Sequence, residues 1–201
     1  MFFFAYFIIP ALLIGFLLRG SLLNLADKPF RCLWLALIAV VLRFTVLSSA
    51  FVNSPLGYLS VPGQILSFIL LLIVALLNFS TPGMPILGLG ILLNLVVMVA
   101  NGGYMPVSPD DLVEIGHPRQ AEILRAGGTD FYGIALTEQT RLPFLADIFV
   151  LPRFFPIRYV FSLGDALIGI GLVIIIVWGM LTKPPAGSEP AGGSDKIIRE
   201  A

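Results

Sequence analysis

The stretch VFSLGDALIGIGLVIIIVWGML, residues 160–181, decides the fold of this chain. It is apolar for long enough to cross a bilayer, which takes roughly 20 residues at about 1.5 Å each. Its single charged residue, Asp165, lies near the beginning. A charge at membrane depth is costly and normally faces a partner or a wet cavity. The stretch therefore predicts a transmembrane helix that carries a polar site.

Four further apolar runs repeat this pattern along the chain. Composition agrees with a bilayer as the solvent, because 58% hydrophobic and 12% charged residues cannot be hidden in a soluble core of 201 residues. We predict an all-α integral membrane protein, a five-helix transmembrane bundle over residues 1–182. The predicted spans are residues 1–18, 32–51, 63–79, 84–100 and 160–181, and residues 101–159 form a long extracytoplasmic loop that contains short helices.

Basic residues in the short connecting segments predict the orientation. Arg19, Lys28 and Arg31 follow the first run, and Lys183 follows the last. Because such residues are retained in the cytoplasm, five crossings place the N-terminus outside and the C-terminus inside. The first run has no basic residues before it, so it is expected to remain as a helix rather than to be cleaved. Residues 183–201 are rich in Pro, Gly, Ser and Ala, which predicts a disordered cytoplasmic tail.

Arg43 is the second ionisable residue inside a predicted span. Counted from the outer ends of the predicted helices, Arg43 lies about 12 Å deep and Asp165 about 8 Å deep, so the two can meet. Asn94 lies at a similar depth, and its amide can bridge the pair. We predict that the second, fourth and fifth helices pack around an intramembrane cluster of Arg43, Asn94 and Asp165.

Two interpretations of this cluster stay open. It is either a neutralised ion pair that fixes helix register, or an ion or proton relay or a polar substrate site. The first is favoured, because an Arg–Asp pair satisfies itself and a relay usually needs additional titratable groups.

The loop after residue 100 opens with a turn and a helix start. Paired glycines at Gly102 and Gly103 permit backbone conformations closed to other residues, which predicts a tight turn. Ser108, followed by Pro109 and two acidic residues, is typical of a helix N-terminus with Ser108 as its cap. This interpretation is favoured over a divalent-cation site. Further along, Glu138 and Arg141 are three residues apart, a spacing suited to one helical face.

Three blocks of sequence in this loop and in the last span carry a resemblance. They are NGGYMPVS (101–108), LTEQTRLPFLAD (136–147) and FSLGD (161–165). Together they resemble DUF5317, a bacterial membrane-protein family defined only as a domain of unknown function, and the resemblance covers nearly the whole chain apart from the tail. It implies a multi-pass protein of the bacterial plasma membrane. It draws attention, without assigning a chemical role, to Asn101, Gly102, Gly103, Met105, Pro106, Ser108, Glu138, Arg141, Asp147, Ser162, Gly164 and Asp165.

The favoured function is a non-enzymatic accessory or scaffold component of a membrane complex. Its partners would be membrane lipids and other membrane-protein subunits; nucleic acid is not expected, because the formal net charge is +0 and no Lys/Arg cluster is present. One alternative is a small-solute or proton transporter or channel that uses Arg43 and Asp165. Another is an enzyme that acts on a lipid-linked substrate at the outer face with Glu138 and Asp147. No metal-ligand spacing or catalytic triad pattern is evident, so no catalytic residue, metal or cofactor is predicted.

Overall fold

The computed structural model describes residues 2–129 and 133–182, and this part of the chain is mostly helical. Each of the five predicted spans coincides with a long helix. The five long helices are α1 (Ala5–Leu17), α3 (Leu33–Leu47), α5 (Ser60–Leu77), α6 (Met84–Ala100) and α9 (Leu163–Leu181). Two helical segments, Gly57–Leu77 and Leu163–Leu181, are long and apolar enough to cross a membrane, and the other three are shorter apolar helices. The predicted disordered tail, residues 183–201, lies outside the described residues.

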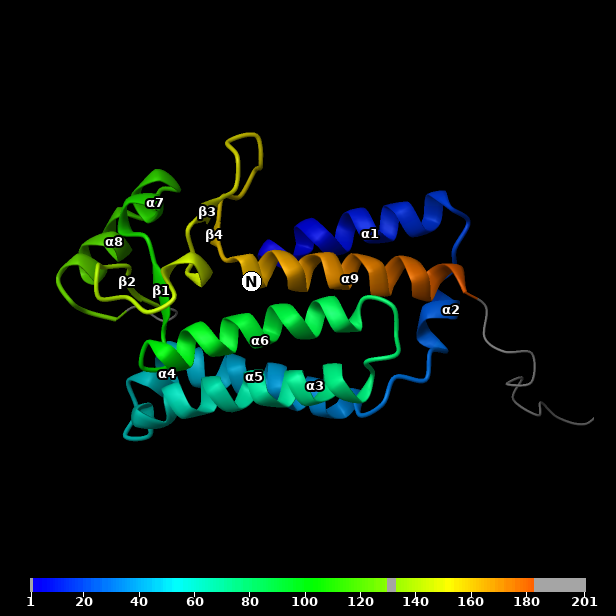
Figure 1. Ribbon diagram of the computed structural model, residues 1–201, viewed down its shortest axis with the longest axis horizontal. Coiled ribbons are helices and arrows are strands. Elements are labelled where there is room, and N and C mark those ends of the chain that lie inside the picture. The colour runs from blue at the N-terminus through cyan, green and yellow to red at the C-terminus, as the bar shows by residue number, and fades with distance from the viewer. Residues whose placement is uncertain (1, 130–132, 183–201) are drawn as a thin grey trace, which may run out of the picture.

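The long helices lie side by side along the long axis of the molecule (Figure 1). The contacts run in the order α1, α9, α6, α5 and α3, each helix packing on the next. The last helix of the chain therefore lies between the first helix and α6. A buried apolar cluster, which includes Phe68 of α5 and Ile91 and Met98 of α6, fills the space between these helices.

The helix α6 has the predicted boundaries, whereas the other four long helices begin or end at different residues, and two of these differences have a clear local cause. The span 32–51 is divided at Ser48, whose backbone is extended and whose hydroxyl accepts a hydrogen bond from the Phe51 N–H at 3.2 Å. This local cap ends α3 and begins the short helix α4 (Ser49–Val52). The last helix begins at Leu163 instead of residue 160, because Val160–Phe161 forms the strand β4.

A segment that we call the loop cap, residues 101–129 and 133–162, covers one end of the bundle (Figure 1). It contains short strands as well as helices, so the fold is not purely α-helical. Strand β1 (Met105–Val107) pairs in parallel with β2 (Gly133–Ala135), and β3 (Phe149–Val150) pairs antiparallel with β4. The helices of the loop cap are α7 (Pro109–Glu114), α8 (Pro118–Arg125) and the 3₁₀ helix η3 (Pro143–Leu145).

The loop cap confirms one local prediction and contradicts another. Ser108 caps α7, because its hydroxyl accepts a hydrogen bond from the Asp111 N–H at 3.2 Å, with Pro109 at the first helical position. The shared helical face expected for Glu138 and Arg141 is wrong, since this part of the chain is a turn in which threonine hydroxyls accept hydrogen bonds from backbone N–H groups. Side-chain bonds of this kind compete with helix formation.

The opposite end of the bundle is closed by the segment around α2 (Leu22–Ala26). The Asn24 amide donates to the carbonyl of Met180 at 2.9 Å, and the Lys28 ammonium donates to the carbonyl of Thr182 at 2.6 Å. The last carbonyls of a helix have no partner within it, so these side chains supply the missing donors. The ammonium also lies 5.0 Å from the ring centre of Trp178. The first connection of the chain is thereby attached to the end of α9.

Two asparagines at helix ends hold distant segments by the same pattern, which we call the asparagine clamp. Asn78, at the end of α5, accepts a hydrogen bond from the Arg31 N–H at 2.7 Å and donates to the Arg31 carbonyl at 2.9 Å. Asn101, at the end of α6, makes the same two bonds with the backbone of Arg141, at 2.9 and 2.8 Å. Each amide also donates to the carbonyl four residues earlier in its own helix. One clamp lies at each end of the α5–α6 hairpin.

Replacing Asn78 by alanine tests the energetic value of a clamp. The change removes the hydrogen-bond partner of one backbone N–H and of two carbonyls, so we expect the free energy of unfolding to fall by about 2 kcal/mol. Asn53→Ala is the matched control, because Asn53 also ends a helix and donates to the carbonyl four residues earlier, Ser49, but makes no side-chain hydrogen bond to another segment within residues 2–129 and 133–182. Reversible unfolding in mixed micelles measures both variants. Equal losses would contradict the clamp.

Candidate functional site

A buried hydrogen-bonded network joins α6 to the beginning of α9. The Asn94 amide donates to the Asp165 carboxylate at 2.7 Å, and the Ser162 hydroxyl donates to the Asn94 amide oxygen at 2.9 Å. Asn94 is 3% exposed and Ser162 is 0% exposed. In such surroundings polar groups must satisfy one another, since water is excluded.

Asp165 also completes the N-terminus of α9. Its backbone N–H donates to the Ser162 hydroxyl at 3.0 Å, and its carboxylate accepts from the Ser162 N–H at 3.5 Å, which is a capping box. The carboxylate therefore lies in the first turn, beside the positive end of the helix dipole. The spacing Ser162-x-x-Asp165 is the sequence signal of this arrangement.

Close backbone contact between α6 and α9 makes the network possible. A Cβ atom on Gly90 would lie 2.5 Å from the carbonyl oxygen of Gly164, and a Cβ on Gly164 would overlap the side-chain amide of Asn94. Only glycine fits at these two positions without a shift of backbone. Small residues at helix contacts allow this approach in general.

Arg43 of α3 and Asp147 of the loop cap extend the network into a charged cluster. The guanidinium carbon lies 4.5 Å from the ring centre of Phe68, and its charge acts electrostatically on both Asp147 and Asp165. The structure thus brings Arg43 into the electrostatic range of Asp165, which Asn94 binds. The predicted packing of the second helix on the fourth and fifth is wrong, because α3 packs mainly on α5. The structure also adds Asp147, which the sequence did not associate with Arg43, Asn94 and Asp165. We call Arg43, Asn94, Asp147, Ser162 and Asp165 the polar centre.

The polar centre lies nearer the end of the bundle than the sequence predicted. Arg43 is four residues before the end of α3, about 6 Å, and Asp165 is two residues after the beginning of α9, about 3 Å. The predicted depths were larger because the spans were assumed to continue to Phe51 and to begin at Val160. The loop cap covers this end of the bundle (Figure 1).

Asp147 reaches the polar centre on the segment that follows η3. This 3₁₀ helix contacts α6 and α9, and the next residue, Ala146, is fully buried. The Asp147 N–H donates to the Pro106 carbonyl at 2.9 Å, and its carbonyl accepts from the Ser108 N–H at 3.3 Å. The backbone of Asp147 is therefore fixed to β1 and to the residue after it.

The Asp147 carboxyl is held in an environment that disfavours its charge. Its Oδ1 is buried and has no hydrogen-bond partner within residues 2–129 and 133–182. Burial, and then repulsion from Asp165, raise the pKa of Asp147 well above its ordinary value, although the charge of Arg43 opposes this change. Desolvation is the largest of the three effects. This carboxyl can therefore take up a proton at a pH where exposed aspartates are ionised.

The other predicted residues of the loop cap position the chain. Asn101 forms a clamp, Gly102 and Gly103 have φ of +75° and +91°, and a Cβ on Gly103 would overlap Val61. Met105 and Pro106 are buried in β1. Glu138 and Arg141 are exposed residues, whereas the Oδ1 of Asp147 is buried. The enzyme hypothesis, which paired Glu138 with Asp147, therefore receives no support from their placement.

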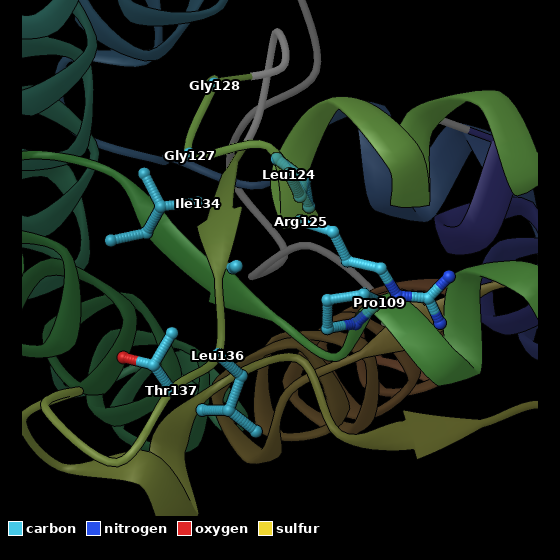
Figure 2. Close-up of a pocket in the computed structure, with 9 residues that line it drawn as sticks. Pro109, Leu124, Arg125, Gly127, Gly128, Ile134, Leu136 and Thr137 are labelled. Carbon is cyan, nitrogen blue, oxygen red and sulfur yellow. The ribbon is translucent and has the colours of Figure 1, made fainter.

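A separate hollow of about 420 Å³ lies within the loop cap, between α8 and β2 (Figure 2). Its lining is mainly apolar and includes Leu124, Ile134 and Leu136. Among its described lining residues Arg125 alone is charged, and this side chain is paired with Asp110 at 2.5 Å. The hollow therefore offers no cluster of reactive groups, and the polar centre is the better candidate site.

Comparison with known proteins assigns the family. The model of a family of unknown function, DUF5317, matches residues 27–177, which include the whole polar centre. The chain belongs to the DUF5317 family. The resemblance predicted from the three sequence blocks is thus confirmed. An uncharacterized protein from Thermotoga maritima is 30% identical over 177 residues, covering 87% of this chain and 89% of that protein. No solved structure matches the chain.

In this DUF5317 protein, Gly164→Ala tests whether the polar centre requires close backbone contact. The added methyl group overlaps the Asn94 amide, so we expect the free energy of unfolding to fall by about 3 kcal/mol or more. Gly102→Ala is the control, because a Cβ there meets open space and the cost is limited to about 1 kcal/mol of left-handed backbone strain. Unfolding in mixed micelles compares the two. A smaller loss in Gly164→Ala than in Gly102→Ala would contradict the packing argument.

Proposed function

We propose that the chain is a multi-pass protein of the bacterial plasma membrane that crosses the bilayer five times and acts as a non-enzymatic accessory or scaffold component. The observation that carries the membrane assignment is the reversed distribution of polar and apolar side chains. On the two edge helices, Leu17 is 83% exposed and Leu37 is 65% exposed, whereas Gln64, Ser67 and Asn94 are buried inside the bundle. Large exposed apolar surface with buried polar groups favours lipid as the surrounding solvent.

The three shorter helices are compatible with this proposal. Helix α1 directly follows the 3₁₀ helix η1 (Phe2–Phe4), and α3 is continued after one residue by α4. Both helical segments are therefore longer than their α-helical cores. Local thinning of the bilayer accommodates a modest remaining mismatch.

The distribution of basic residues supports an N-terminus outside and a C-terminus in the cytoplasm. Lys28 is bonded to the end of α9, and Arg31 is held by the Asn78 clamp, so both lie at the end of the bundle opposite the loop cap. Retention of such residues in the cytoplasm would put the loop cap on the outer face. The loop cap contains acidic and basic residues, which a long external loop tolerates.

The accessory role is supported by the edge helices. Helix α1 packs mainly on α9, and α3 packs mainly on α5. Their remaining faces are broad and apolar, and on α3 the face carries Trp34, Leu37 and Phe44. In a bilayer such a face contacts lipid or the helix of another subunit. The proposal assigns α3 to a protein partner, because its one charged residue, the half-buried Arg43, faces the polar centre and so favours a fixed rotation of the helix.

Site-directed labelling tests the orientation. In a Cys32→Ser background, Phe154→Cys in the loop cap should react with a membrane-impermeant maleimide in intact cells. Asp27→Cys, at the opposite end of the bundle, should react with the maleimide only after the cells have been permeabilised. The reverse pattern, or equal labelling of both before permeabilisation, would reject the proposed topology.

Photocrosslinking tests the accessory role. A photoreactive amino acid at Leu37 should capture one defined membrane protein, and the same protein should copurify in stoichiometric amount in a mild detergent. The control position is Ile9 on α1, which is also exposed and apolar. If Leu37 and Ile9 capture lipid alone and the purified protein is free of partners, the accessory role fails.

A proton or small-solute transport role has one observation in its favour. Asp147 supplies the additional titratable group that a relay built on Arg43 and Asp165 would need. In proteoliposomes, flux that is lost in Asp165→Asn would favour transport and would replace the accessory proposal.

A further inference from the structure

We propose that the polar centre binds one proton at Asp147 and that this proton holds the segment 142–147 of the loop cap on the bundle. The inference rests on the geometry of the polar centre and does not require the accessory role or a transport role. In the seated state, Arg43 and Asp165 are charged and Asp147 is neutral. Loss of the proton leaves a buried net negative charge. The segment then lifts, with loss of the two backbone hydrogen bonds that Asp147 makes with Pro106 and Ser108, so that the Asp147 carboxylate reaches water.

Hydrogen bonds identify which of the two aspartates takes the proton. Asp165 accepts bonds from the Asn94 amide and from the backbone of Ser162, and these donors suit a carboxylate. The Oδ1 of Asp147 is buried and has no hydrogen-bond partner among the described residues. A buried carboxylate oxygen without a donor is costly, and protonation removes most of that cost. Asp147 is therefore the acceptor.

The charges around Asp147 determine that the ligand is a proton. The charged groups that act on it are Asp165 of α9 and Arg43 of α3, while α5 and α6 bring the uncharged Phe68 and Asn94 to the cluster. One proton makes the sum of the three ionisable side chains zero. A metal ion would lie close to the Arg43 guanidinium and would find the Asn94 oxygen already occupied by the Ser162 hydroxyl. Both features disfavour a metal.

The backbone around Asp147 limits the movement to a short segment. The Asn101 clamp holds Arg141 before the segment, and Leu142 has a left-handed φ of +55° where the chain turns toward the bundle. The part that rests on α6 and α9 is η3, with Leu145 and Ala146 buried beneath it. The Asn101 clamp thus fixes the chain before residue 142. Within the segment, the backbone hydrogen bonds of Asp147 to Pro106 and Ser108 hold the seated state together with the contacts of η3, and they must open when the segment lifts.

The pH dependence has a defined sign. Because the pKa of Asp147 is raised in the seated state, seating is strongest below the ordinary aspartate pKa. It weakens as pH rises toward the raised value, by at most tenfold in the seating equilibrium per pH unit for one proton. Above the raised value no further change is expected.

Accessibility of the buried Leu145 position measures the seating. In full-length Cys32→Ser protein in lipid nanodiscs, the maleimide reaction rate of Leu145→Cys is divided by that of Phe154→Cys, which cancels the intrinsic pH dependence of the thiol. We expect this ratio to rise with pH between 5 and 9, by up to about tenfold per unit, and then to reach a plateau. A ratio that does not change with pH would overturn the proposal.

Two variants separate Asp147 from other carboxyl groups. Asp147→Asn, which mimics the neutral acid, should keep the ratio low at every pH. Glu138→Gln is the matched control from the same loop, since Glu138 is exposed, and it should preserve the pH dependence. Persistence of the pH dependence in Asp147→Asn would reject Asp147 as the site. If adding Na⁺ at fixed pH changed the labelling ratio as much as the change of pH does, the proton would be rejected as the ligand of Asp147.

A measurement on the unsubstituted side chain covers the case in which Asp147→Asn does not fold. Infrared difference spectra of the full chain should show the carbonyl band of a protonated carboxylic acid that disappears over the same pH range as the change in the labelling ratio. If no such band is present at the low end of the range, the proposal is wrong. Neither readout depends on a partner protein, so failure of the accessory role leaves this test intact.

Discussion

The structure depends on one constraint, the mutual satisfaction of polar groups where the beginning of α9 meets α6. Asn94, Ser162 and Asp165 exchange hydrogen bonds in a space from which solvent is excluded. If any one of these groups is removed, another is left without its hydrogen-bond partner in a low-dielectric environment, which is costly. The network therefore fixes the position of α9, and α9 in turn carries α1 and the end of the segment around α2. Glycines at positions 90 and 164 are a consequence, because the network needs the two backbones in contact.

Charge is shared between elements that are far apart in the chain. Arg43 comes from an edge helix, Asp165 from the central helix and Asp147 from the loop cap. One guanidinium near two carboxyl groups cannot neutralise both of them if both are ionised, and this distinguishes the polar centre from a simple ion pair. It also couples the loop cap to the bundle through electrostatics as well as through the apolar contacts of η3.

The sequence predicts those features that depend on local pattern. The five long helices follow from hydropathy and length, and Ser108 follows from the residue types around it. Counting residues from helix ends was enough to associate Asn94 with Asp165, because depth is a local property of a straight helix. Asp147 could not be associated in this way. Its position depends on the path of the loop cap, which returns to the bundle where the Asn101 amide binds the backbone of Arg141, 40 positions later in the chain.

Other differences between expectation and structure have equally specific causes. The break at Ser48 comes from a single hydroxyl that caps the next helix, and hydropathy is insensitive to such a bond. Strands β3 and β4 have two residues each, too few for an alternating pattern. The turn at Glu138 is closed by threonine hydroxyls, whereas the spacing to Arg141 alone is equally compatible with a helix.

The span of sequence between Asn94 and Asp165, 71 residues, has a consequence for biosynthesis. At about 5–20 residues per second, the ribosome completes α6 several seconds before it delivers the carboxylate that its amide will bind. During that interval the Asn94 amide lacks the Asp165 carboxylate that it binds in the folded chain. Translation products that stop short of α9 lack this partner permanently, so the α6 amide in them stays without the bond that positions the two helices.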